Sequence, residues 1–179
     1  FGLSAIRNLG DNAIYELINS REKDGDFLSL ADICDRIPSN LLNRRALESL
    51  IYCGALDKLE INSNRAQLIS NLDYVIDWAS SRARDRLSGQ GNLFDFDSEK
   101  TDLKKQDNFS AISAAVPVSD YPPAEKLKLE KEILGFYLSD HPLKQLSDPA
   151  KLIAPISLGN LHEQSDRSKV SCIAMIPEM

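Results

Sequence analysis

Residues 3–18 read LSAIRNLGDNAIYELI, and this stretch decides the fold. Its start is apolar and short, which predicts one helical turn, and Ala13, Ile14, Leu17 and Ile18 then recur with the spacing of one helix face. Between the two lies Asn8-Leu9-Gly10-Asp11. Gly10 tolerates a positive φ angle and Asp11 can cap the helix that follows. The stretch therefore predicts a helix, a tight turn and a second helix.

The same pattern continues to residue 86. Ser29 begins a short helix that stops before Pro38. Residues 39–43 open a further helix that ends at Cys53-Gly54, and another covers 64–78. We predict a mainly α fold in four parts. These are an all-helical region at 1–86, a flexible loop rich in Gly, Ser, Asp and Pro at 87–123, an amphipathic helix at 124–143, and a linker with a β start at 144–179, where 170–176 is the best strand candidate.

The composition is that of a globular protein and excludes several classes. Apolar residues make up 42% and charged residues 27% of 179, and the net charge is −6. This charge argues against nucleic-acid binding by a general basic surface, so any DNA contact must be local. Three widely spaced cysteines form no metal pair or closed disulfide set, and no membrane span or export signal is present. We therefore expect a cytoplasmic protein without membrane contact.

The two ends of the chain suggest a larger protein. The chain begins with Phe1 rather than Met, and it stops directly after the predicted strand. We expect the sequence to continue at both ends.

The turn between the first two predicted helices is the first candidate site. Backbone N–H groups at such a turn, with the positive end of the following helix, can hold a DNA phosphate without reading sequence. A second glycine turn follows the helix that carries Arg44 and Arg45, and the two turns could grip both strands. The candidate DNA-binding residues are Arg7, Asn8, Leu9, Gly10, Asp11, Arg44, Arg45, Gly54 and Ala55. The alternative for both turns is a helix corner in which glycine serves only the turn.

Several blocks together resemble a known family. The segments FGLSAIRNLG at 1–10, SLAD at 29–32, NRRALESLI at 43–51 followed by GALD at 54–57, and EKEILGFYLSDHPL at 130–143 are similar to the alpha subunit of bacterial DNA polymerase III. The resemblance implies a tandem helix-hairpin-helix bundle that binds the DNA backbone behind the polymerase site. It also implies that an OB-fold domain begins near Leu152, truncated here after its first strand.

Residues 90–94 form the second candidate site. Gln90, Gly91, Asn92, Leu93 and Phe94 are similar to the short peptide by which this family binds its ring-shaped sliding clamp, the beta subunit. A glutamine can hydrogen-bond the clamp backbone while Leu and Phe fill an apolar pocket. Gly91 and Asn92 depart from the favoured pattern and supply neither apolar contact nor rigidity. The alternative is that Leu93 and Phe94 fold back onto the helices.

The sequence offers no catalytic constellation. A polymerase needs carboxylates that hold two divalent metal ions, and the family's metal-binding motif is not found here. We therefore predict no catalytic residue, no metal ligand and no cofactor in this segment, with the divalent metal, magnesium, held elsewhere in the parent polymerase. The expected partners are duplex DNA, the sliding clamp and other polymerase III holoenzyme subunits. Two alternatives stay open: a structural spacer between polymerase and OB domains, and the same segment of an error-prone relative.

Overall fold

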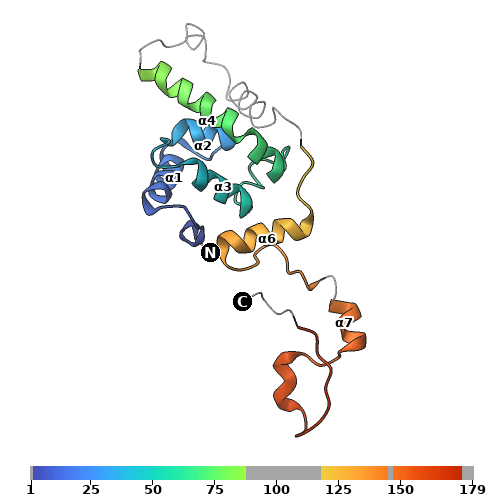
Figure 1. Ribbon diagram of the computed structural model, residues 1–179. Coiled ribbons are helices and arrows are strands. Elements are labelled where there is room, and N and C mark those ends of the chain that lie inside the picture. The colour runs from blue at the N-terminus through green and yellow to red at the C-terminus, as the bar shows by residue number, and fades with distance from the viewer. Residues whose placement is uncertain (1, 88–117, 145–146, 175–179) are drawn as a thin grey trace. The chain divides into compact units, whose positions relative to one another are not determined.

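The computed structural model of the protein describes residues 2–87, 118–144 and 147–174. Every regular element within these ranges is a helix, so the mainly α prediction is confirmed (Figure 1). The chain divides into two compact units, residues 1–136 and 137–179. The first contains η1 (Leu3–Ala5), α1 (Asp11–Asp24), α2 (Leu30–Arg36), α3 (Arg44–Tyr52), α4 (Arg65–Leu87) and α6 (Pro123–Leu134). The second contains α7 (Ser147–Ile153) and η4 (Leu158–Glu163).

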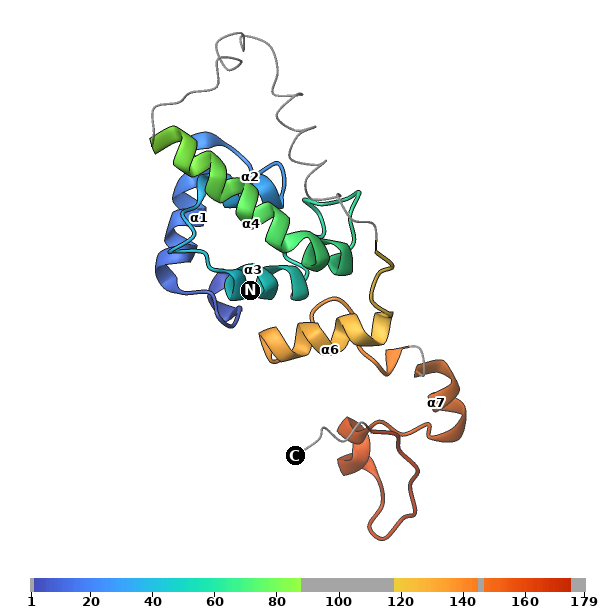
Figure 2. The ribbon, with the colours of Figure 1, turned by 45° about the horizontal axis from the view of Figure 1, so that its top comes forward.

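The core of the first unit lies where α4 packs along α2 and α3 (Figures 1 and 2). Leu30 of α2, Ile51 of α3 and Val75 of α4 are completely buried. Leu9 and Ala13 bring the first turn and α1 into the same apolar cluster. Each buried Leu, Ile or Val side chain stabilises the fold by about 1.5 to 3 kcal/mol relative to an exposed one. The helices and the turns between them therefore share one core.

The start of α2 is fixed by three polar side chains. The Ser29 hydroxyl accepts a hydrogen bond from the Asp32 N–H at 3.1 Å, and the Asp32 carboxylate accepts one from the Leu28 N–H at 2.9 Å. The buried carboxylate of Glu60 accepts a third from the Leu30 N–H at 2.6 Å. Negative charge at a helix N-terminus is stabilised by the helix dipole. These bonds confirm the predicted Ser29 cap and tie the chain after α3 to α2.

Two of the predicted element boundaries change. The helix predicted over 124–143 ends at Leu134, because Gly135 adopts a left-handed conformation with φ of 85° and its N–H bonds the Lys131 carbonyl. The helix predicted over 64–78 is longer than expected and runs to Leu87. Its last turns are held to α2, since Arg82 and Arg86 both pair with Asp35.

The second unit is largely exposed. Leu152 and Ile153 of α7 are 89% and 74% exposed, and none of the described side chains in 137–174 is buried. Residues 170–174, the described part of the predicted strand, are irregular. A strand is held by backbone hydrogen bonds to a neighbouring strand, and residues 147–174 contain no such partner. The OB-fold start therefore stays a prediction.

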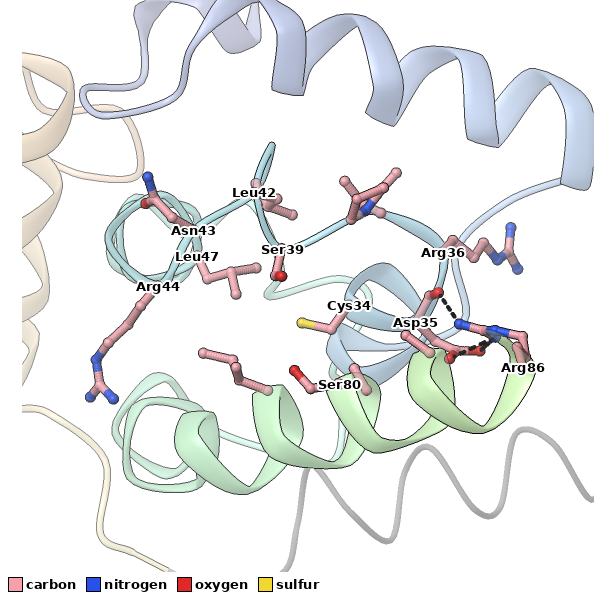
Figure 3. A pocket seen from close by; sticks show the side chains of 15 residues that line it. Cys34, Asp35, Arg36, Ser39, Leu42, Asn43, Arg44, Leu47, Ser80 and Arg86 are labelled. Atoms are coloured by element: carbon pink, nitrogen blue, oxygen red, sulfur yellow. Dashed lines mark hydrogen bonds and ion pairs between the residues drawn. The ribbon is translucent and has the colours of Figure 1, made fainter. Parts of the chain in front are cut away.

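A cavity of about 350 Å³ lies between α2, α3 and α4 (Figure 3). Its walls are mainly apolar, the sulfur of Cys34 and the hydroxyl of Ser80 point into it, and Asp35 and Arg86 form an ion pair at one end (Figure 3). Burial, helped by the charge of Asp35, raises the pKa of the Cys34 thiol to about 12. Since the thiolate is the reactive form of cysteine, this cavity contains no activated nucleophile.

The three cysteines should differ in reactivity. We expect Cys172, which is exposed, to react quickly with a thiol reagent at pH 8. Cys34 and Cys53 should react only after unfolding, because burial raises the pKa of both thiols. Thiol counting with and without denaturant checks this. Fast reaction of more than one thiol in the folded chain would contradict the packing of α2 and α3.

Candidate nucleic-acid interface

The first turn is held by Asn8 and Leu9. Asn8 has a φ of 65°, and its side-chain amide donates a hydrogen bond to the Ser49 hydroxyl of α3 at 3.0 Å. Asn tolerates this left-handed conformation better than most residues because its polar side chain can hydrogen-bond nearby. Leu9 is buried and anchors the turn in the core. The prediction that Gly10 supplies the positive φ angle is wrong, since Gly10 has a φ of −77° and Asn8 has the left-handed conformation.

Gly10 is the N-cap residue of α1 and leaves the helix end open. Asp11 is the first helical residue rather than the predicted cap, and Gly10 makes no side-chain capping bond. The Ile14 N–H bonds the Gly10 carbonyl, but the N–H groups of residues 11–13 bond no acceptor among the described residues. A Cβ atom built on Gly10 would meet nothing within 4 Å. Free N–H groups at a helix start, beside open space, are the arrangement that binds a phosphate.

Two free arginine side chains belong to the same region. Arg7 and Arg45 are exposed, and neither guanidinium makes a hydrogen bond or an ion pair in the part of the chain that the structure describes. The Arg45 carbonyl accepts a hydrogen bond from the Ser49 hydroxyl at 3.0 Å, and Ser49 also contacts Asn8. Arg44 differs, because it pairs with Glu48 at 2.8 Å and with Asp73. The backbone of Arg45 is therefore linked to the first turn through Ser49, whereas the side chain of Arg44 is ion-paired with two carboxylates.

The second turn is closed by its own backbone. Gly54 has a φ of 78°, the Gly54 N–H bonds the Ile51 carbonyl at 3.0 Å, and the Ala55 N–H bonds the Leu50 carbonyl at 3.1 Å. This pair of bonds is the Schellman motif, which ends a helix by satisfying its last carbonyl groups. Both N–H groups of the turn are thus used to cap α3.

The guanidinium of Arg65 fills the space over Gly54. Arg65, 6% exposed, begins α4 and donates hydrogen bonds to the Asp57 carboxylate at 2.6 and 2.9 Å and to the Tyr52 carbonyl at 3.0 Å. A Cβ atom on Gly54 would collide with this guanidinium. Burial by itself lowers the pKa of Arg65, but the hydrogen bonds and charge of Asp57, with the charge of Glu130, raise it above its ordinary value. Arg65 therefore stays charged inside the fold.

Comparison with known proteins agrees with this geometry. The family model described as "Helix-hairpin-helix motif" matches residues 1–68, which include both turns. The chain is 39% identical over 148 residues to the DNA polymerase III subunit alpha of Deinococcus radiodurans, covering 81% of this chain and 10% of that protein. It is 34% identical to the same subunit of Neisseria meningitidis serogroup B over 92% of this chain and 13% of that protein, and 32% identical to that of Escherichia coli strain K12 over 95% and 14%.

The chain belongs to the DNA polymerase III alpha-subunit family. It spans about an eighth of the length of the family members that it matches. The family resemblance found in the sequence is confirmed, and so is the helix-hairpin-helix motif.

The predicted site residues of this family member fall into separate places. Arg7 to Asp11 form the first turn, Arg45 is linked to it through Ser49, and Gly54 and Ala55 lie in the closed second turn. The predicted clamp-binding residues, Gln90 to Phe94, lie outside the described residues. Sequence reasoning missed Arg65 and Glu130. Nothing in the linear pattern marks these two charged residues as buried.

No metal site was found in the described part of this family member. Its described residues contain no group of three or more His, Cys, Asp or Glu side chains that could hold a metal ion. None of the helices searched combines the length and the apolar composition needed to cross a membrane.

The two turn glycines should respond differently to alanine. We expect Gly54→Ala to lower the free energy of unfolding by about 2 kcal/mol or more, because a left-handed alanine alone costs roughly 1 to 2 kcal/mol and Arg65 must also move. Gly10→Ala is the matched control and should change it by less than about 1 kcal/mol. Urea denaturation followed by circular dichroism measures both. Equal losses would contradict the difference between the turns.

Proposed function

We propose that this chain is a non-catalytic, DNA-binding segment of a replicative DNA polymerase III alpha subunit. The observation that supports this most directly is the first turn, which has unbonded helix-start N–H groups, open space at Gly10 and the exposed, unpaired Arg7 within it. Family membership supports it as well. The reaction of the parent polymerase, its divalent metal and its contacts with other holoenzyme subunits would belong to parts of the protein outside this segment.

The proposed contact is between the first turn and one phosphate of duplex DNA. The N–H groups of residues 11–13 donate to the phosphate oxygens, the helix dipole of α1 favours the negative charge, and Arg7 adds a cation. None of these groups reads a base edge, so binding is indifferent to sequence. The negative charge of Asp11 repels the phosphate, so we expect weak binding. Gly54 and Ala55 are not part of this proposal, because their N–H groups cap α3.

Binding to a short DNA duplex tests the proposal. We expect a Kd of about 10⁻⁴ to 10⁻⁶ M near physiological salt, independent of sequence. Gly10→Val should weaken binding by at least about tenfold, because its side chain blocks hydrogen bonds to a charged group worth about 1.5 kcal/mol or more. Arg7→Gln should reduce the salt dependence by about 0.9 in the slope of log K against log salt. Fluorescence anisotropy measures each quantity.

Arg21→Gln is the matched control for Arg7→Gln. Arg21 is also exposed, but it lies in the last turn of α1, roughly 15 Å along the helix from Gly10. This substitution removes the same charge and should leave the salt slope nearly unchanged. If both substitutions reduced the salt slope equally, DNA binding would be a diffuse electrostatic attraction rather than the proposed contact.

We also propose that Gln90 to Phe94 bind the sliding clamp. The support is the resemblance of these five residues to the clamp-binding peptide of the family. Burial of Leu93 and Phe94 would contribute about 1.5 to 3 kcal/mol each, before the cost of ordering the peptide. Micromolar affinity needs about 8 kcal/mol, so binding should be micromolar or weaker in isolation. Binding to DNA beside the clamp raises the effective concentration enough for such an affinity to serve.

Calorimetry with the cognate clamp tests this contact. We expect weak binding by the unsubstituted chain and none by the variant with Leu93→Ala and Phe94→Ala. The Gly10→Val variant is the control and should bind the clamp normally. Absence of clamp binding at millimolar concentration would rule out this site. If DNA binding were absent too, the segment would be a spacer between domains.

A further inference from the structure

Helix α6 packs against the helix-hairpin-helix region. Figures 1 and 2 show α6 beside α3, and the two helices pack against each other. The residues that precede α6 also contact this region. The Val118 carbonyl accepts a hydrogen bond from the Asn64 side-chain amide at 2.7 Å, and the centroids of the Tyr121 and Tyr52 rings are 6.4 Å apart. These contacts place the segment before α6 against the end of α3 and the start of α4.

Glu130 holds α6 against the rest of the first unit. Its side chain is only 1% exposed, so it lies on the face of α6 that packs inward. A buried carboxylate is tolerated only where it is paired or hydrogen-bonded, so Glu130 favours one position of α6. Its negative charge also raises the pKa of Arg65.

Ile133 attaches the same helix to the first turn. Its carbonyl is in the last turn of α6, where helical carbonyls have no partner within the helix, and it accepts a hydrogen bond from the Arg7 N–H at 3.3 Å. Ile133 and Leu134 also pack on the core. Residues 130 and 133 are three apart and lie on neighbouring positions of one helix face. The buried Glu130 side chain and the contact at Arg7 are therefore about one helical turn apart.

We propose that the second hairpin supports DNA binding without touching DNA. The end of α3 and the start of α4 hold the segment before α6, and buried Glu130 holds α6 itself. The Ile133 carbonyl of α6 then fixes the backbone of Arg7, so that its unpaired guanidinium reaches the phosphate on the first turn. Glu130 is thus a positioning residue for Arg7. This inference rests on the proposed binding of DNA by the first turn.

A double-mutant cycle on the full chain tests the coupling. We expect Glu130→Gln to weaken binding to a short duplex by about three- to tenfold and to reduce the salt slope by up to about 0.9, the contribution of one phosphate contact. In the Arg7→Gln background, Glu130→Gln should not weaken DNA binding further, because the contact of Arg7 with the phosphate is already lost. If Glu130 had only a structural role, Glu130→Gln would lower the free energy of unfolding, and its effect on DNA binding would add to that of Arg7→Gln.

Two matched variants separate the explanations. Glu132→Gln removes the same charge from an exposed position on α6 and should change nothing. Lys58→Gln removes an exposed cation from the second turn and should also leave the salt slope unchanged. If Lys58→Gln reduced the slope as much as Arg7→Gln does, the second turn would touch DNA directly, and the inference would be overturned.

The remaining outcomes are also decisive. Additive effects of Glu130→Gln and Arg7→Gln, or unchanged binding by a folded Glu130→Gln variant, would overturn the inference while leaving the proposed function intact. Should Glu130→Gln fail to fold, Leu134→Ala loosens the last turn of α6 and must show the same non-additive effect with Arg7→Gln. If the unsubstituted chain does not bind DNA, or if Arg7→Gln has no effect, the proposed function itself fails.

Discussion

The packing of the first unit depends on a buried arginine. The Arg65 guanidinium occupies the space over Gly54 and bonds the Asp57 carboxylate and the Tyr52 carbonyl. One side chain therefore joins the end of α3, the turn and the start of α4. Removal of one partner from a buried ion pair costs about 3 to 5 kcal/mol, because the other charge is left without compensation. Asp57 is half exposed, which reduces this cost.

This constraint explains why two similar turns differ in their chemistry. Both contain a glycine between helices, and both fall within the matched helix-hairpin-helix motif. At the first turn the left-handed residue is Asn8, and the helix-start N–H groups remain free. At the second turn Gly54 is left-handed, and its N–H groups bond the α3 carbonyls. The two turns are similar in sequence, but the first has free N–H groups and the second does not.

The acidic balance of the chain is compatible with a local DNA contact. The net charge is −6, yet Arg7 and Arg45 have no carboxylate partner among the described residues, whereas Arg36, Arg44, Arg65, Arg82 and Arg86 are all paired. Long-range steering of DNA by such a protein is weak, and affinity must come from contact geometry. If the proposed function holds, a contact this weak would need a second attachment, and the proposed clamp contact would be one.

The sequence by itself determined the family, the helical class and most helix starts, because these follow from local signals: the Ser29 and Asn43 caps, apolar spacing and the Gly54 break. It placed the end of α6 too late, since Gly135 adopts the left-handed conformation that ends the helix. Only the tertiary structure decided which turn is open. The reason is that Arg65, Glu130 and Ser49 act on residues distant in the chain, and the burial of a charge depends on which helices pack around it.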